Sequence, residues 1–283
     1  MRWLIYGFAF WAIAFWINLL IARTPLREKR WARVFVPALF GFTLLVVWES
    51  MVRGLNVSPI ILPAPTAIAE RFMAARDILW QDFVQTAVKG ALSGYVIGAI
   101  AAFSTAILVD RSDFLQKGLL PIGNFVAALP IVGIAPILVK WYGFGWESKS
   151  AVVVVMVFFP ILINTVQGLR ETSAMQRDLM HTYAAGYWTT LIKLRLPAAM
   201  PFVFNGLKIG TTLALIGAIV AEYFGSPIYG MGFRIQSEAG RLSMDMVWAE
   251  IAVAALAGSA FYGTVTLMEK IVTFWHPSQR GQG

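Results

Sequence analysis

The stretch SAVVVVMVFFPILINTVQGL, residues 150–169, contains no charged side chain. A helix of this length crosses the hydrocarbon core of a bilayer, which is about 30 Å thick and takes roughly 20 residues. Comparable apolar runs occupy residues 3–22, 34–52, 84–109, 118–142, 198–221 and 246–274. The sequence therefore predicts an all-α polytopic membrane protein with seven spans. The run at 118–142 is the least regular, because Pro121, Pro130 and Pro136 interrupt it.

The composition also indicates that a bilayer is the solvent for this chain. Of its 283 residues, 58% are hydrophobic and 13% are charged, whereas soluble domains carry about 25% charged residues. The net charge of +8 is not arranged as a basic stripe with interleaved aromatic residues, so it does not favour nucleic-acid binding. The chain has no cysteine, which excludes disulfides, thiolate metal sites and a cysteine nucleophile within it.

A basic loop after the first run predicts the orientation in the membrane. Its charged residues are Arg23, Arg27, Lys29, Arg30 and Arg33 against the single acidic residue Glu28. Short loops rich in Lys and Arg stay on the cytoplasmic side. We therefore expect the N-terminus outside and the segments 110–117, 170–197 and 276–283 inside, with residues 1–32 forming a first helix and its basic cytoplasmic loop.

Residues 178–201, DLMHTYAAGYWTTLIKLRLPAAMP, have the pattern of a short amphipathic helix in one of the inside loops. Asp178 would lie at the positive end of the helix dipole, and Lys193 and Arg195 at the negative end. Leu196 and Pro197 are expected to end this helix before the next span begins.

One side of this predicted helix carries apolar residues, and another side carries small residues. The apolar residues, near a 3.6-residue period, are Leu179, Tyr183, Tyr187 and Leu191. Ala184, Ala185 and Gly186 would let another backbone approach closely. Such a helix requires a partner, and the residues alone allow either a groove on another protein or a layer of lipid headgroups.

The same segment resembles the cytoplasmic loop of permeases of type I ABC importers. The motif of that family is acid-x-Ala-x-x-x-Gly-Ala-Ser-x-Trp, followed nine residues later by Leu-Pro and then Ala-Ala-x-Pro. The matching positions are Asp178, Thr182, Ala185, Trp188, Lys193, Leu196, Pro197, Ala198, Ala199 and Pro201. Two positions depart from it: Met180 replaces the motif alanine, and Ala184 stands at the motif glycine, with Gly186 two residues later.

Further matches in the same order extend the resemblance over residues 33–275. They are Trp48-Glu49, Leu62–Pro65, Leu129–Ile131, Trp141–Gly143, Phe159–Thr165, Gly206–Ile209 and Ile219–Gly225. The chain is most similar to the branch that takes up nitrate, taurine and other sulfonates, and vitamin precursors. The stretches Gly230–Phe233 and Trp248–Glu250 resemble the vitamin-precursor members, such as those for pyrimidines or riboflavin.

The resemblance implies a fold and a set of partners. Residues 33–275 would form a permease bundle of six core helices in the bacterial inner membrane, with 3–22 as an added helix. The chain would be half of a dimer, beside a second copy or a paralogue, and would receive solute from an extracytoplasmic binding protein. A separate ATPase would bind ATP and Mg, since this chain has no Gly-x-x-x-x-Gly-Lys-Ser/Thr stretch, and no cofactor is expected on the chain itself.

The resemblance also implies which residues couple to the ATPase, in a helix at about 178–195. They are Asp178, Thr182, Ala184, Ala185, Gly186, Tyr187, Trp188, Lys193 and Pro197. Polar residues within the spans are the candidates to face the solute pathway: Asn124, Asn164, Asn205, Thr211, Thr212 and Glu222. Interhelical hydrogen bonding is the alternative for each of them.

Three other charged residues lie in or beside apolar spans. Glu49 and Glu222 are expected near the outer interface, where a carboxylate reaches water and has a structural or gating role. Lys208 is expected to extend its ammonium group to the cytoplasmic surface.

Two other classes of protein are alternatives to an importer permease. A secondary transporter driven by an ion gradient would show inverted repeats with matching broken helices, and no such repeat is apparent. A membrane-embedded enzyme would need clustered His, Asp and Glu residues. The two histidines, His181 and His276, lie far apart in the sequence and indicate neither a catalytic nor a metal site.

Overall fold

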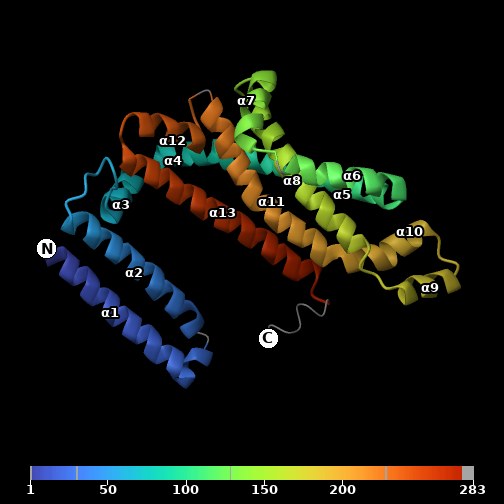
Figure 1. The fold of residues 1–283 in the computed structure, drawn as a ribbon, viewed down its shortest axis with the longest axis horizontal. Helices are drawn as coiled ribbons and strands as arrows, with labels where there is room; N and C mark the ends of the chain where they lie inside the picture. Colours follow the sequence, from blue (N-terminus) through green and yellow to red (C-terminus); the bar gives the residue numbers. More distant parts are fainter. Residues whose placement is uncertain (1, 30, 128, 227, 276–283) are drawn as a thin grey trace. The chain divides into compact units, whose positions relative to one another are not determined.

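The computed structural model describes residues 2–29, 31–127, 129–226 and 228–275 of the chain. The tail expected at 276–283 lies outside these residues. Within the described residues the secondary structure is helical, without strands (Figure 1). The α-helices are α1 (Arg2–Arg23), α2 (Ala32–Gly54), α3 (Pro65–Ala74), α4 (Arg76–Phe83), α5 (Ser93–Asp110), α6 (Asp113–Ala127), α7 (Ile131–Tyr142), α8 (Trp146–Leu169), α9 (Ala174–Thr182), α10 (Tyr187–Thr190), α11 (Leu196–Phe224), α12 (Met231–Gly240) and α13 (Met244–Val272). The 3-10 helix η1 (Pro25–Glu28) and the π-helices η2 (Val84–Leu92) and η3 (Leu191–Arg195) complete them.

Six continuous helices in the described part of the chain are long and apolar enough to cross a membrane. They cover Arg2–Arg23, Ala32–Gly54, Arg76–Asp110, Trp146–Leu169, Tyr187–Phe224 and Met244–Val272. The predicted all-α membrane fold is confirmed. The remaining expected run, 118–142, is divided between α6 and α7, because Pro130 caps α7 in an extended conformation (φ −68°, ψ 116°) and has no N–H to continue a helix.

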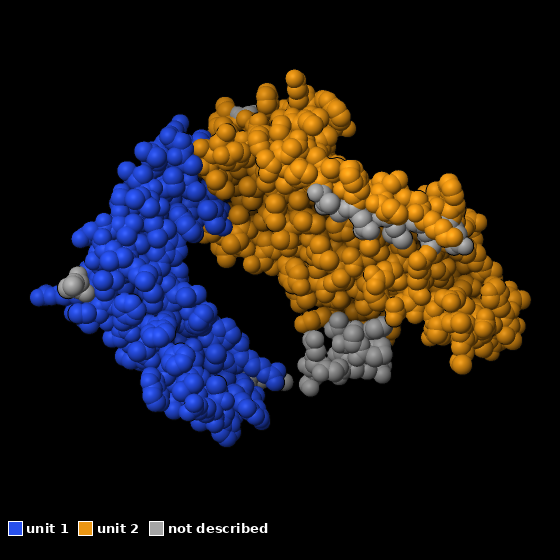
Figure 2. All heavy atoms as spheres, in the orientation of Figure 1, with its two compact units in different colours: residues 1–79, 237–251 blue, residues 80–236, 252–283 orange. Residues whose placement is uncertain are grey.

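The chain divides into two compact units, which are coloured separately in Figure 2. The first unit contains residues 1–79 and 237–251. Within it α1 lies so close to α2 that a Cβ on Gly7 would overlap the side chain of Ser50. Small residues at such positions let helices pack closely in a membrane. The expected first helix therefore exists and packs along α2.

Glu49 stabilises the connection from α2 to α3 in the first unit. Its carboxylate accepts hydrogen bonds from the backbone N–H of Thr66 at 3.0 Å and from the Thr66 hydroxyl at 2.8 Å. Arg53, one turn further along α2, forms an ion pair with the same carboxylate. Thr66 lies in the first turn of α3, where backbone N–H groups lack partners within the helix. Glu49 therefore has a structural role here.

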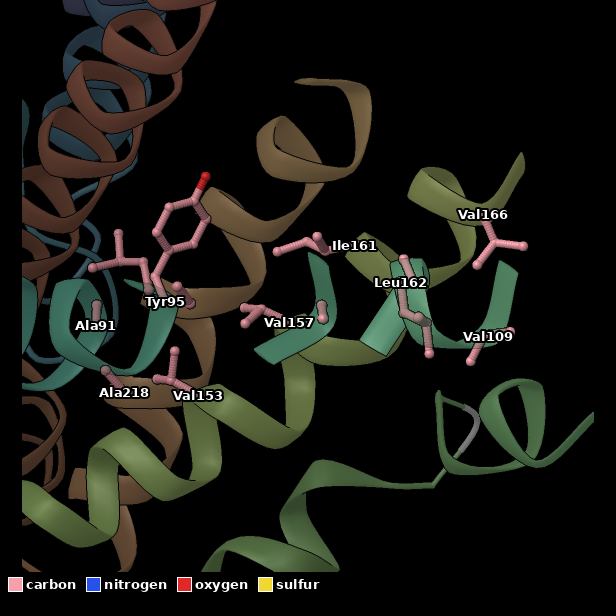
Figure 3. Close-up of a cluster of buried hydrophobic side chains, with 13 residues drawn as sticks. Ala91, Tyr95, Val109, Val153, Val157, Ile161, Leu162, Val166 and Ala218 are labelled. Carbon is pink, nitrogen blue, oxygen red and sulfur yellow. The ribbon is translucent and has the colours of Figure 1, made fainter. Parts of the chain in front are cut away.

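The second unit contains residues 80–236 and 252–283, and its core is built around α8. Figure 3 shows the apolar side chains that meet there, among them Tyr95 of α5, Val153, Val157 and Ile161 of α8, and Ala218 of α11. A Cβ on Gly94 of α5 would lie 2.6 Å from the carbonyl oxygen of Ser150. The missing side chain thus permits the close packing of α5 on α8, and the packed helices carry a polar cluster at each end.

Candidate functional site

The segment between α8 and α11 begins with helix α9, whose start is defined by a capping box. The Ser173 hydroxyl accepts a hydrogen bond from the Gln176 backbone N–H at 3.2 Å, and the Gln176 side chain accepts one from the Ser173 N–H at 3.0 Å. Asp178 was expected at the N-terminus of this helix, but the cap places it in the second turn. The Thr182 hydroxyl donates to the Asp178 carbonyl at 3.0 Å.

Helix α9 ends in a tight turn at Ala184. This residue has a φ of 52°, the left-handed conformation that favours glycine. The Ala184 N–H donates to the His181 carbonyl at 2.8 Å, and the Ala185 N–H donates to the Met180 carbonyl at 3.0 Å. These two bonds define a Schellman motif. The prediction of a single helix at 178–195 is therefore wrong. Helix α9 stops at Thr182, and Gly186, with a φ of −70°, caps the next helix, α10.

The sequence predicted that the helix ends at Leu196 and Pro197, but it continues through them. Helices α10, η3 and α11 form one continuous helical segment, Tyr187–Phe224. A proline inside an α-helix clashes with the carbonyl group four residues before it. The wider π-turn at Leu191–Arg195 lies directly before Pro197 and accommodates its ring. Pro197 is the second residue of α11 and follows this π-turn within the continuous helix.

Apolar side chains are exposed along α9 and the turn that follows it. Met175, Leu179 and Tyr183 are 82%, 56% and 76% exposed, and their spacing of four places them on one side. Trp188 is 56% exposed on α10, whereas Leu191 is buried against the bundle. Of the expected apolar side, Leu191 thus packs against the bundle, whereas Leu179 and Tyr183 are exposed. We call Met175, Leu179, Tyr183 and Trp188 the exposed apolar surface.

Arg195 connects this segment to the ends of two other helices. Its guanidinium group donates to both carboxylate oxygens of Asp110, at the end of α5, at 2.6 and 2.7 Å. It also donates to the carbonyl of Leu169, the last residue of α8, at 2.9 and 3.0 Å. The Tyr187 hydroxyl donates to Asp110 at 3.1 Å, and the Arg111 guanidinium lies 5.1 Å from the centre of the Tyr187 ring. We call Asp110, Leu169, Tyr187 and Arg195 the joint, because a displacement of α10 there reaches α5 and α8 directly.

A second polar cluster lies at the opposite end of α11, around Glu222. This carboxylate has no exposed surface. One of its oxygens accepts hydrogen bonds from the Thr86 hydroxyl at 2.7 Å and from the Gly232 N–H at 3.0 Å. The Glu222 carboxylate does not reach water as expected, because it is buried and holds η2 and the start of α12 against α11.

Three more charged residues complete that cluster. Asp82 accepts from the Gly230 N–H at 2.6 Å and from the Arg234 guanidinium at 2.8 Å. The ammonium group of the buried Lys149 donates to the carbonyls of Phe144, at 2.7 Å, and Gly225. We call Asp82, Thr86, Lys149, Glu222 and Arg234 the buried hub.

Glycines allow the chain to fold closely around the buried hub. Gly230 has a φ of 121°, and a Cβ on Gly232 would overlap the carbonyl oxygen of Ile219. Of this cluster, the sequence predicted only Glu222 as a candidate site residue. Asp82 and Lys149 could have been noticed because they are charged residues at the ends of apolar runs.

The structure brings together two of the predicted pathway residues. Asn205 on α11 donates to the Asn164 side chain on α8 at 2.9 Å, and Asn164 donates to the Pro160 carbonyl at 2.8 Å. Thr211 is buried and bonds to its own helix, whereas Thr212 is exposed. The side chain of Asn124 lies outside the described residues. A pathway role stays a prediction for all six residues: Asn124, Asn164, Asn205, Thr211, Thr212 and Glu222.

Lys208 does not extend toward a surface as expected. Its ammonium group forms an ion pair with Glu269 of α13 at 2.8 Å, with the two side chains 19% and 10% exposed. Within the described residues, His, Asp and Glu side chains nowhere gather into a group of three that could hold a metal ion.

Comparison with known proteins places this arrangement among transport permeases. The family model described as "Binding-protein-dependent transport system inner membrane component" matches residues 94–274. A probable ABC transporter permease protein of Haemophilus influenzae is 32% identical over 82% of this chain and 94% of its own length. The riboflavin transport system permease protein of Chloroflexus aurantiacus is 29% identical, over 89% of this chain and 94% of its own. The formylaminopyrimidine transport permease protein of Halalkalibacterium halodurans is 28% identical, over 89% and 100%.

Proposed function

The chain belongs to the family of binding-protein-dependent transport system inner membrane components, the permeases of ABC importers, and from this premise we propose that it forms half of an ATP-driven import pathway and couples to a separate ATPase through residues 174–195. It is a multi-pass membrane protein of a non-catalytic family. The proposal concerns how the chain is driven, which other proteins complete it, and what it transports.

The exposed apolar surface is the observation that carries the proposal. Met175, Leu179 and Tyr183 present more than half of their area to the surroundings on a helix outside the candidate spans. Exposed apolar patches rimmed by polar residues mark interaction sites. Arg195 and Asp110 attach the segment to the bundle by paired, charge-assisted hydrogen bonds, which are stronger than neutral ones. A protein bound at this surface could therefore move the ends of α5, α8 and α11 together.

Other components would complete the importer. We propose that a second permease, either another copy or a paralogue, forms the other half of the pathway, and that an extracytoplasmic binding protein delivers the solute. ATP and Mg would bind to the ATPase, with no cofactor on this chain. In this arrangement residues 170–197 and the tail are cytoplasmic and the N-terminus is outside, as the basic loop at residues 23–33 predicts.

We propose that the solute is of one of two chemical kinds. Relatives are named for riboflavin and formylaminopyrimidine transport, and others for aliphatic sulfonates or taurine. The first kind is nitrate or a sulfonate such as taurine, and the second is a vitamin precursor of the pyrimidine or riboflavin type.

The coupling proposal is tested by removing three of the four side chains of the exposed apolar surface and leaving Trp188 in place. The chain is co-expressed with the ATPase encoded beside its gene and reconstituted in lipid nanodiscs. The test variant is Met175→Ala/Leu179→Ala/Tyr183→Ala. The matched control, Ile97→Ala/Ile100→Ala/Leu108→Ala, removes comparably exposed apolar area from α5. Copurification of the ATPase and its rate of ATP hydrolysis are measured for both.

We expect the control to retain the ATPase and the test variant to lose at least tenfold in association or in regulated hydrolysis. The test variant should keep its folded yield, because its three side chains are mostly exposed. Equal association of both variants would refute docking at this surface. If no ATPase associates with the wild type and an imposed proton or sodium gradient drives uptake, the ion-driven transporter replaces the importer.

A further inference from the structure

We propose that a pocket beside the buried hub binds the transported solute, and that it accepts planar aromatic molecules that carry hydrogen-bond acceptors or a negative charge. The pocket is lined by Trp80, Gln81, Val84, Gln85, Lys89 and Tyr229. The inference rests on the proposed function and narrows its two kinds of solute to one.

The pocket has the size of a small-molecule site. Its volume is about 390 Å³, within the range of roughly 300–1,000 Å³ found for ligand pockets. All of its lining residues belong to the second unit. Five come from α4 and η2, and Tyr229 comes from the turn before α12. Because α4 and η2 begin the span Arg76–Asp110, the pocket lies at the same end of the bundle as Glu222, far from the joint.

Lys89 places a positive charge at this pocket. It lies on η2 within the membrane-spanning segment Arg76–Asp110. Among the residues that the structure describes, its ammonium group has neither an ion pair nor a hydrogen bond to another side chain. An ionisable side chain inside a span is expensive and marks a functional site by default. π-turns also occur frequently at functional sites, because they change the direction of side chains along a helix.

The buried hub fixes the backbone beside one aromatic wall of the pocket, that of Tyr229. Trp80 stacks on Phe83, with ring centres 5.2 Å apart. The carbonyl of Tyr229 accepts a hydrogen bond from Ser226 at 2.6 Å, and the next N–H, that of Gly230, donates to Asp82 at 2.6 Å. A wall that is fixed before the ligand arrives loses little entropy on binding. The hub and the pocket are therefore joined through the backbone at Tyr229 and Gly230.

The chemistry of the lining residues selects the kind of solute. Indole and phenol rings attract flat π-systems, which gain stacking energy from them. The amides of Gln81 and Gln85 offer both donors and acceptors, and the Lys89 ammonium offers donors and a positive charge. A heteroaromatic ring with carbonyl, ring-nitrogen or phosphate groups stacks on the aromatic rings and also forms hydrogen bonds with the polar side chains. A small aliphatic anion would pair with Lys89 but leave the aromatic walls without a partner.

The absence of cysteine from the chain makes a direct test available. A single cysteine at Val84, inside the pocket, reports access of a membrane-impermeant maleimide added from outside to the assembled importer. Val88→Cys is the matched control, because it lies one turn further on the same helix, is 45% exposed and does not line the pocket. Labelling rates are measured without solute and with riboflavin, 4-aminopyrimidine or taurine. If the Val84→Cys chain fails to assemble, Gln81→Cys supplies the reporter.

We expect riboflavin or 4-aminopyrimidine to slow labelling of the pocket cysteine at least fivefold, and taurine to have no effect. Val88→Cys should show no protection by any solute. Adding Lys89→Gln should weaken the protection at least fivefold without changing ATPase association. The proposal is overturned if the pocket cysteine does not react, if no aromatic probe protects it, or if taurine protects it equally. Association of the ATPase in the same samples distinguishes these failures from a failure of the proposed function.

Discussion

The buried hub and the exposed apolar surface lie near opposite ends of α11. The hub is polar and buried, whereas the surface is apolar and exposed. Arg195 and Glu222 are separated by about 40 Å of helix. At the Glu222 end, Asp82, Thr86, Lys149 and Glu222 have no exposed surface. Near the Arg195 end, Met175 is 82% and Tyr183 76% exposed. The hub is assembled from residues of one chain, with one Glu222 carboxylate oxygen left without a hydrogen-bond partner among the described residues, whereas Met175, Leu179 and Tyr183 are more than half exposed.

This difference indicates that the Glu222 end of α11 is rigid and that the Arg195 end transmits movement. Buried polar groups with satisfied hydrogen bonds make a local structure rigid and specific. An apolar surface attached through a few charged bonds can be displaced as one piece. The hub thus suits a fixed site for a solute, and the joint suits the transfer of movement. Three substitutions test this contrast, in order of decreasing effect.

The largest effect is expected from breaking the buried hub with Asp82→Ala. This change leaves the Gly230 N–H without its acceptor and removes one carboxylate that pairs with Arg234. Removal of one partner from a buried ion pair costs about 3–5 kcal/mol. We expect a clearly lower midpoint of thermal unfolding in detergent. Asp77→Ala on the same helix is the control, since the Asp77 side chain is 91% exposed and its loss should change nothing. Equal unfolding midpoints for the two variants would show that the hub does not stabilise this end.

A smaller effect on stability, with a larger effect on coupling, is expected at the joint. In Arg195→Lys the charge remains, but the planar fork that contacts Asp110 and Leu169 together is lost. We expect a loss of about 1–3 kcal/mol, from hydrogen bonds to charged groups, and a roughly tenfold lower ratio of solute transported to ATP hydrolysed. Arg170→Lys, at an exposed arginine nearby, should preserve the ratio. An unchanged ratio in Arg195→Lys would mean that movement passes elsewhere.

The smallest effect is expected from Ala184→Gly, which should stabilise the turn after α9. A non-glycine residue in the left-handed region costs roughly 1–2 kcal/mol, and Ala184 occupies that region. Part of this gain is offset by the greater freedom of glycine in the unfolded chain. We expect slower amide hydrogen exchange in α9, by up to about tenfold. Gly186→Ala, with an ordinary φ of −70°, should not slow exchange. Faster exchange in Ala184→Gly would contradict the assignment of strain to this turn.

The membrane fold could be predicted from the sequence because span length is a local property. The runs 3–22 and 150–169, which carry no charge, became continuous helices of about the expected extent, Arg2–Arg23 and Trp146–Leu169. Pro130 likewise divided its run as its chemistry requires. These features depend on residues that are neighbours in the chain, and the physics of the bilayer leaves few alternatives.

The site could be predicted only in part, because its geometry depends on distant residues. The resemblance selected the segment around 178–195, but the period of its apolar residues did not reveal the left-handed turn at Ala184. Pro197 did not end a helix, because the π-turn before it relieved the clash. The pairing of Asp110 with Arg195 and of Asp82 with Arg234 joins residues that are 85 and 152 positions apart, and no local pattern in one sequence records it.

The most direct test of the account is a cross-link between α9 and the ATPase. Tyr183→Cys introduces a unique cysteine on the exposed apolar surface, and Leu256→Cys places one on α13 at a side chain that is 63% exposed. The assembled importer is treated with a short photoactivatable maleimide while its ATP hydrolysis is monitored. The account predicts an adduct between the chain and the ATPase from Tyr183→Cys and none from Leu256→Cys. An active importer in which Tyr183→Cys is fully labelled yet never joined to the ATPase would contradict it.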